Sequence, residues 1–425
     1  MRLIIALSLF ITIHLQAQTI DQLINRSEVE RIERVLSSDK MEGRKTFSAG
    51  IERAGDFIAS EFKKAGLQPW KGLDGYRQAI GMLQPKSAGI SGILNKQPLK
   101  EQHLIAFTSL PQLHITQDSG FEVTSIKPGD NLFREAYKYI HSNKNYLVLV
   151  DTGFAANFNR LIQLKEQMFK SANSAIFILT ADTPKEYDIT ATHQILSLNM
   201  ANIVGVLPGK TRPNEYVIFS SHYDHLGIGK PVNGDSIYNG ANDDAAGTTA
   251  VIMLAKYFKA LDNNGRTLVF ATFTAEEIGG FGSQYFSKQF DSSSVMAMFN
   301  IEMIGTDSKW GKNSAYITGY EKTNMGETLS KNLKGTGFRF YPDPYPDQQL
   351  FYRSDNATLA RLGVPAHTIS TSKMDSEKFY HTVDDEIETL DMSNMAMIIK
   401  AIALSSRSIV NGTDTPSRVN TKLLR

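Results

Sequence analysis

The chain has 425 residues, of which 41% are hydrophobic and 21% are charged, a composition typical of a folded globular protein rather than a disordered one. Its 45 basic and 44 acidic side chains give a formal net charge of +1, so the electrostatic signature of a nucleic-acid-binding protein is missing. Cysteine is absent, which excludes a thiol nucleophile, disulfides and zinc held by thiolates. Any metal ion would have to be held by His, Asp and Glu.

The N-terminus is typical of a cleavable export signal. Arg2 precedes an apolar run from Leu3 to Leu15, and Ala17 is a small residue at a suitable cleavage position. The run is shorter than the roughly 20 apolar residues that span a bilayer, although a retained anchor is the alternative. We therefore expect a signal peptide over residues 1–17, and an exported protein, periplasmic or extracellular, with no membrane insertion after cleavage.

Residues 18–83 are expected to form the N-terminal part of a larger domain that continues after the segment 84–200. Between about residues 28 and 66, apolar side chains recur at helical spacing on either side of a loop, Met41-Glu42-Gly43-Arg44. Gly66 then marks the end of the second helix.

From 84 to 200 the sequence pattern changes to short apolar segments separated by polar residues. Strands are expected at Tyr146–Val150 and Ala175–Leu179, with a helix around Asn157–Phe169. We expect an inserted smaller subdomain here, α/β or β-rich, which resembles protease-associated insertions only loosely.

From 201 to 408 strands alternate with helices, which predicts an α/β fold with a mostly parallel sheet flanked by helices on both faces. Residues 409–425 are expected to be a polar, frayed tail. The expected strands are Tyr216–Ser221, Thr267–Phe273, Val295–Ile301 and Ala366–Ile369, and the expected helices are Ala245–Leu261 and Gly282–Lys288.

Candidate metal ligands follow these strands or begin the helices after them. In open α/β sheets, functional sites lie beyond the carboxyl ends of the strands, so side chains at several strand ends could converge. Imidazole nitrogens and carboxylate oxygens together suit zinc. The candidates are His222, Asp224, Asp243, Asp244, Glu276, Glu277, Glu302 and His381.

Most of these residues also have an ordinary structural explanation. Asp243 and Asp244 could cap a helix, and Glu276 and Glu277 could place favourable charge at a helix N-terminus. Glu302 is different because it lies in an otherwise apolar segment, where a carboxylate is costly unless it is paired or binds a metal.

Several short segments, in this order, resemble the motifs of the co-catalytic zinc aminopeptidase family. This metallopeptidase group, family twenty-eight, includes bacterial leucyl aminopeptidases and, more distantly, glutamate carboxypeptidase and glutaminyl cyclase. The resemblance covers residues of about 30–80 and 200–395 and implies the zinc exopeptidase fold. The segments are Ser221-His222-Tyr223-Asp224, Gly240-Ala241-Asn242-Asp243-Asp244-Ala245-Ala246-Gly247, Thr274-Ala275-Glu276-Glu277, Arg353-Ser354-Asp355, Leu362-Gly363-Val364-Pro365 and Tyr380-His381-Thr382.

The resemblance implies a site for two zinc ions. His222 and Glu302 would hold one ion, His381 and Glu277 would hold the other, and Asp243 would bridge them. Cobalt or manganese could replace zinc, because carboxylate-rich sites accept several divalent ions.

The resemblance also implies roles for two further acidic residues. Asp224 would accept the second ring N–H of His222, and Glu276 would act as general base and then as general acid. Two positions depart from the family: it usually has Asp where Glu302 stands, and many members have His or Tyr where Asn356 stands.

These roles imply an aminopeptidase that hydrolyses N-terminal residues of peptide substrates by means of a water that bridges the metal ions. A glutaminyl-cyclase-like transferase with one zinc ion and a non-catalytic binding ectodomain are the alternatives. Carboxypeptidase action is a variant that needs a cation for the substrate carboxylate, and Arg353 and Arg361 are available.

Overall fold

The computed structural model describes residues 20–425, so the predicted signal peptide lies outside the described residues. The described chain forms two compact units. One contains the residues up to Ile80 together with Ala201–Arg425, and the other contains Gly81–Met200, against the expected insertion at 84–200. Within the described part, no helix has the length and apolar character needed to cross a membrane.

Two N-terminal helices lie where the apolar spacing predicts them. Helix α2 (Arg26–Leu36) begins at Asn25, whose side chain accepts a hydrogen bond from the backbone of the first turn. Helix α3 (Ala49–Lys64) begins in the same way at Ser48. The short 3₁₀ segment Asp39–Arg44 joins them.

The first unit is built on a mixed sheet with a parallel centre. Strands β18, β15, β11 and β14 are parallel neighbours, whereas β10 and β16 join this group in antiparallel pairs. The mostly parallel sheet expected from the sequence is therefore present at the centre. In spatial order the strands are β17 (Arg339–Pro342), β16 (Ser314–Ile317), β18 (Ala366–Ser370), β15 (Val295–Ile301), β11 (Arg212–His222), β14 (Arg266–Phe273) and β10 (Tyr187–Leu207).

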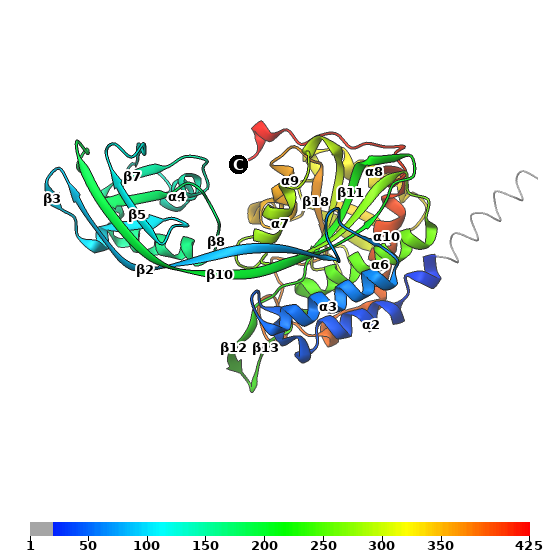
Figure 1. The fold of residues 1–425 in the computed structure, drawn as a ribbon. Helices are drawn as coiled ribbons and strands as arrows, with labels where there is room; N and C mark the ends of the chain where they lie inside the picture. The colour runs from blue at the N-terminus through cyan, green and yellow to red at the C-terminus, as the bar shows by residue number, and fades with distance from the viewer. Residues whose placement is uncertain (1–19) are drawn as a thin grey trace, which may run out of the picture. The chain divides into compact units, whose positions relative to one another are not determined.

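Helices cover both faces of this sheet (Figure 1). Adjacent residues of β11 point to opposite faces of the sheet and belong to different hydrophobic cores. Phe219 packs with α2, α3, α6 and α10, whereas Ile218 packs with α7 and α9. This alternation follows from the two-residue period of a strand. The helices are α6 (Ala246–Leu261), α8 (Met325–Asn332) and α10 (Met392–Ser405) on the first face, and α7 (Phe281–Ser287) and α9 (Asn356–Ala360) on the second.

The C-terminal segment is packed rather than frayed, so the expectation for residues 409–425 is wrong. A further short helix, α11 (Arg407–Val410), follows α10. The backbone N–H of Val419 donates to Gly363, and the buried Arg266 donates to the carbonyl of Asp414. These contacts to backbone carbonyls hold a polar segment without an apolar pattern.

The second unit has a four-stranded sheet of its own. Its strands lie in the order β4 (Leu104–Phe107), β9 (Ala175–Leu179), β7 (Tyr146–Val150) and β6 (Glu122–Ile126), and helix α4 (Leu132–Ile140) connects the parallel pair β6 and β7. In the same unit, β5 (Gln112–Thr116) pairs with residues 188–192 of β10. Two long strands, β2 (Arg77–Leu94) and β10, run from one unit into the other; the sequence analysis did not identify them.

The helix expected around Asn157–Phe169 is mostly a 3₁₀ helix. Only Ala155–Phe158 is α-helical, and Asn159–Lys165 continues with 3₁₀ geometry. Phe158 and Leu161 are fully buried and Leu164 packs against the same core. A spacing of three residues places side chains on one line of a 3₁₀ helix, which explains the difference.

We predict that Glu61 on α3 stabilises the fold in a pH-dependent way. Its carboxylate is buried and lies 2.7 Å from both Arg31 and Lys256 and 2.8 Å from Lys64. Burial works to raise the pKa of Glu61, but these three cations hold it at about 2, against 4.5 for an ordinary Glu. The stabilisation is therefore complete above about pH 4.5 and is lost as the pH falls toward 2.

Glu61→Gln should lower the free energy of unfolding at pH 7 by about 1.5–3 kcal/mol, the range for hydrogen bonds to charged groups. The difference from wild type should shrink at acidic pH, because the wild type then loses its own ion pairs. Urea unfolding at pH 7 and near pH 3 measures both values, with the exposed Glu327→Gln on α8 as the control. An equal loss at both pH values would contradict the role assigned to charge.

Candidate metal centre

Three neighbouring parallel strands deliver acidic and imidazole side chains to one edge of the sheet. His222 is the last residue of β11 and lies opposite Phe273, the last residue of β14. Glu276 and Glu277 follow β14 after a short turn, and Glu302 directly follows β15. Because the strands are parallel, their carboxyl ends meet.

Asp243 enters this group from a turn of π-helix, Ala241–Ala245, directly before α6. The Asp243–Asp244 peptide bond is cis. The carboxylate of Asp385 accepts hydrogen bonds from the backbone N–H groups of Asn242 (2.8 Å) and Asp243 (3.0 Å). Asp385 therefore fixes the turn that presents Asp243.

The sequence-predicted ligands lie close together in space. His222 Nε2 is 3.2 Å from Asp243 Oδ1, and His381 Nε2 is 3.2 Å from Asp243 Oδ2 and 3.3 Å from Glu277 Oε2. Two groups of ligand atoms, each within 4.8 Å of one another, share Asp243: one also contains His222 and Glu302, and the other also contains His225, His381 and Glu277.

The donor atoms fit a divalent cation. In the described chain, His222 Nε2, His381 Nε2 and Glu302 Oε2 are buried and have no hydrogen-bond partner. Buried polar atoms without partners are costly, and nitrogen and carboxylate oxygen are the donors that zinc takes in the absence of thiolates. A carboxylate oxygen of Glu302 lies within 4.8 Å of the ligand atoms of His222 and Asp243. The Glu that stands where the family usually has Asp therefore belongs to this ligand group.

His225 also belongs to this centre, although the sequence analysis did not select it. Its side chain is fully buried, and its Nδ1 lies 2.9 Å from Glu277 Oε1 and 3.8 Å from Asp243 Oδ2. The ring packs against Gly240, where a Cβ atom would lie 2.5 Å from the ring carbons. An Nδ1–H donated to Oε1 leaves Oε2 of Glu277 facing His381. The only available sequence signal was a second His three residues after His222.

Asp224 has a different role from the one that the resemblance implies. The ring Nδ1 of His222 lies 3.1 Å from the backbone carbonyl of Asp224 and 3.8 Å from its carboxylate. The carboxylate instead accepts the backbone N–H groups of Glu276 (3.1 Å) and Glu277 (3.3 Å) and the hydroxyl of Thr46 (3.2 Å). The carbonyl of Asp224 therefore holds the ring of His222, and its carboxylate anchors the loop after β14.

Asp244 also binds backbone rather than metal ligands. Its carboxylate accepts the backbone N–H groups of His222 (3.3 Å), Gly247 (2.9 Å) and Met303 (3.1 Å). These bonds connect the ends of β11 and β15 to the start of α6. Burial, the largest influence, raises the pKa of Asp244 well above its usual value.

Arg44, in the segment between α2 and α3, holds the backbone next to the candidate ligands. It is completely buried. Its guanidinium donates to the backbone carbonyls of Leu36 (2.7 Å), Tyr223 (2.9 Å), Asn239 (2.6 Å) and Gly240 (2.8 Å). The loop that carries His225 and the turn that carries Asp243 therefore depend on one side chain outside the sheet.

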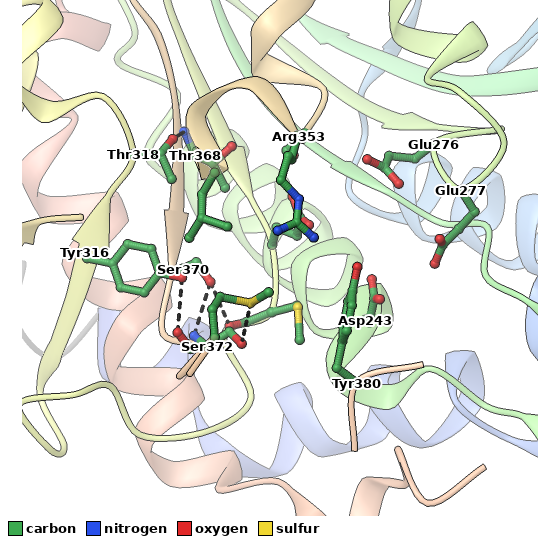
Figure 2. Close-up of a pocket in the computed structure, with 15 residues that line it drawn as sticks. Asp243, Glu276, Glu277, Tyr316, Thr318, Arg353, Thr368, Ser370, Ser372 and Tyr380 are labelled. Carbon is green, nitrogen blue, oxygen red and sulfur yellow. Dashed lines mark hydrogen bonds between the residues drawn. The ribbon is translucent and has the colours of Figure 1, made fainter. Parts of the chain in front are cut away.

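A cavity opens onto the candidate ligands (Figure 2). Asp243, Glu277 and Glu302 line it together with Glu276 and Tyr380. Burial, followed by repulsion from Glu302 and other nearby carboxylates, raises the pKa of Glu276 well above its usual value. Burial and the neighbouring carboxylates likewise raise the pKa of the Tyr380 phenol, so this hydroxyl remains a hydrogen-bond donor.

Asn356, the second departure from the family, supports the fold behind the cavity. It is fully buried, donates to the carbonyls of Phe351 (3.1 Å) and Ala366 (3.3 Å), and accepts the hydroxyl of Thr368 (2.9 Å). An amide that both donates and accepts suits this position.

We predict that His225 positions Glu277 for metal binding. His225→Ala should weaken zinc binding about 10–100-fold, because partners that orient a ligating group typically contribute this much. His225→Asn should retain most of the affinity, because its amide N–H lies near the position of Nδ1. Competition with a chromophoric chelator measures both.

His103→Ala, in the second unit, is the matched control. Wild-type affinity in His225→Ala would contradict the prediction. Equal losses in the Ala and Asn variants would show that the ring itself ligates the ion.

Comparison with known proteins identifies related sequences and folds. Residues 202–405 match the model of Peptidase family M28. A probable leucine aminopeptidase of Trichophyton verrucosum is 31% identical over 204 residues, which cover 46% of this chain and 53% of that protein. Leucine aminopeptidase 1 of Aspergillus niger is 28% identical over 222 residues, which cover 49% and 55%. The chain thus spans about half the length of the curated relatives that it matches.

Solved structures share the fold. An aminopeptidase from Aneurinibacillus sp. strain AM-1 aligns with a TM-score of 0.55 and 16% identity, covering 92% of this chain and 95% of its own. A zinc aminopeptidase from Bacillus subtilis aligns with a TM-score of 0.54 and 15% identity, covering 93% and 98%. From the family match, the relatives and the strand-end ligands together, we conclude that residues 202–405 form a Peptidase family M28 domain.

Proposed function

We propose that this protein is a di-zinc aminopeptidase that removes N-terminal residues from peptides. The observation that carries the proposal is the sharing of Asp243 by two groups of ligand atoms. One group would hold an ion through His222, Glu302 and Asp243, and the other through His381, Glu277 and Asp243. The names of the leucine aminopeptidase relatives support the substrate class.

Zinc ions, when bound, would act as Lewis acids toward a peptide carbonyl and lower the pKa of a water molecule. The chain supplies the proton transfers. Glu276 would accept a proton from the attacking water as the new C–O bond forms, and would return it to the leaving nitrogen as the C–N bond breaks.

Tyr380 would position the substrate. Its phenol lines the cavity beside Asp243 (Figure 2), and it can donate a hydrogen bond to a carbonyl oxygen on which negative charge develops. Glu277, held by His225, and Asp243, held through its backbone by Asp385, would fix the place of a bound ion relative to Glu276.

We further propose that the protein is exported. The basic residue Arg2, the apolar run from Leu3 to Leu15 and the small residue Ala17 support this proposal. N-terminal sequencing of the mature protein tests it, and an intact Met1 would contradict it.

We predict that Glu276→Gln retains zinc and loses turnover. Removing a general base typically lowers the rate about 10²–10⁴-fold, whereas the amide leaves the ligand atoms in place. Metal analysis and hydrolysis of an amino-acid anilide panel measure the two properties, with Glu327→Gln as the control. A wild-type rate in Glu276→Gln would remove this residue from the mechanism.

Chelation should abolish hydrolysis, and zinc should restore it. The expected metal content is two ions per chain, because each ligand group has its own His and Glu. One bound ion together with cyclisation of an N-terminal Gln peptide would instead support a glutaminyl-cyclase-like transferase. Activity that survives complete removal of metal would contradict both assignments.

A further inference from the structure

The cavity beside the candidate metal centre contains one cation, Arg353. It carries the only positive charge among the described residues that line this space. In Figure 2 its guanidinium points into the cavity, between the labelled carboxylates and a wall of hydroxyl groups. A peptide bound at the centre would therefore meet Arg353.

Arg353 has no carboxylate partner in the part of the chain that the structure describes. Its side chain is exposed, and its one hydrogen bond, to Gln348 Oε1, is 3.4 Å long. Arg31, Arg77 and Arg266, by contrast, are each paired with a carboxylate. A guanidinium offers a planar fork of donors that matches a carboxylate, and at Arg353 this fork is available to a ligand.

The wall opposite the carboxylates is polar. It presents hydroxyl-bearing residues, several of which are held by internal bonds: Tyr316 donates to the carbonyl of Ser372 (3.1 Å), and Thr368 donates to Asn356 (2.9 Å). Met303, Leu350 and Met374 also line the cavity, so its surface is mixed. A polar part of a substrate can form hydrogen bonds with the hydroxyl-bearing residues. The residues are Tyr316, Thr318, Thr368, Ser370 and Ser372.

We infer that Arg353 binds a carboxylate of the substrate, so that the preferred peptides carry one within its reach. This inference rests on the proposed function. The carboxylate has two possible sources, an acidic N-terminal side chain or the C-terminus of a dipeptide. In either case Arg353 acts in recognition, and Glu276 acts in the chemistry.

Matched substrates distinguish the two sources. Glu-anilide and Gln-anilide have nearly the same shape and no C-terminal carboxylate, so a kcat/KM ratio of about 10–100 in favour of Glu, the range expected from one charge-assisted hydrogen bond, assigns the side chain. Leu-Gly and Leu-Gly-amide make the same comparison for the C-terminus. Ratios near one in both pairs would overturn the inference, even if the enzyme cleaves all four substrates.

Variants locate the effect. Arg353→Gln should bring the favoured ratio close to one, Arg353→Lys should retain part of it, and Arg353→Glu should invert it. Arg361→Gln, an exposed Arg outside the cavity lining, is the control and should keep the wild-type ratio. An unchanged ratio in Arg353→Gln would overturn the inference.

A binding measurement separates this inference from the proposed function. Calorimetry on zinc-loaded Glu276→Gln should detect tighter binding of glutamate α-amide than of glutamine α-amide, or of Leu-Gly than of its amide, and Arg353→Gln in the same background should abolish the difference. If no peptide is cleaved but this preference remains, the peptidase proposal fails and the carboxylate site stands. If binding shows no preference, the carboxylate site fails.

Discussion

Crowding of buried negative charge is the constraint on which the rest of the site depends. Asp243, Glu276, Glu277 and Glu302 line one cavity, and Asp244 lies directly behind them. Charges of one sign at this spacing repel strongly where water is excluded. Asp224 and Asp244 accept several backbone N–H groups, which compensates for their burial. Asp243 and Glu277 instead face imidazole nitrogens, and this set of donor atoms suits a divalent cation. The division between supporting and ligating carboxylates follows from which of these environments each one has.

Three acidic residues and one basic residue hold the backbone around these carboxylates in a fixed arrangement. Asp224 holds the loop after β14, Asp244 joins three backbone segments, and Asp385 holds the turn before α6. Arg44 gathers four carbonyls under the same loops. All four side chains bind main-chain atoms, so they fix where the ligands stand without depending on the identity of the neighbouring side chains. Such preorganisation lets the ligands meet a cation with little rearrangement.

The sequence predicts the helices on both faces, the parallel centre of the sheet and the convergence of the strand-end ligands, because apolar periodicity and strand ends are local signals. It does not predict contacts with backbone atoms. The carbonyl acceptors of Arg44 and the N–H donors of Asp224 belong to residues of any type, so no motif marks them. His225 was missed for a related reason, since its partner Glu277 lies 52 positions away. The packed tail depends likewise on main-chain bonds.

The position of Arg44 bears on how the chain can be divided. The M28 match begins at residue 202, yet the guanidinium that holds Tyr223, Asn239 and Gly240 comes from a loop more than 150 positions earlier in the sequence. A recombinant fragment cut at the boundary of the family match would lose the donor of these three carbonyls and would expose the apolar residues of α6 that pack with α2 and α3. The first helical hairpin and the residues from Ala201 onward therefore belong to one compact unit.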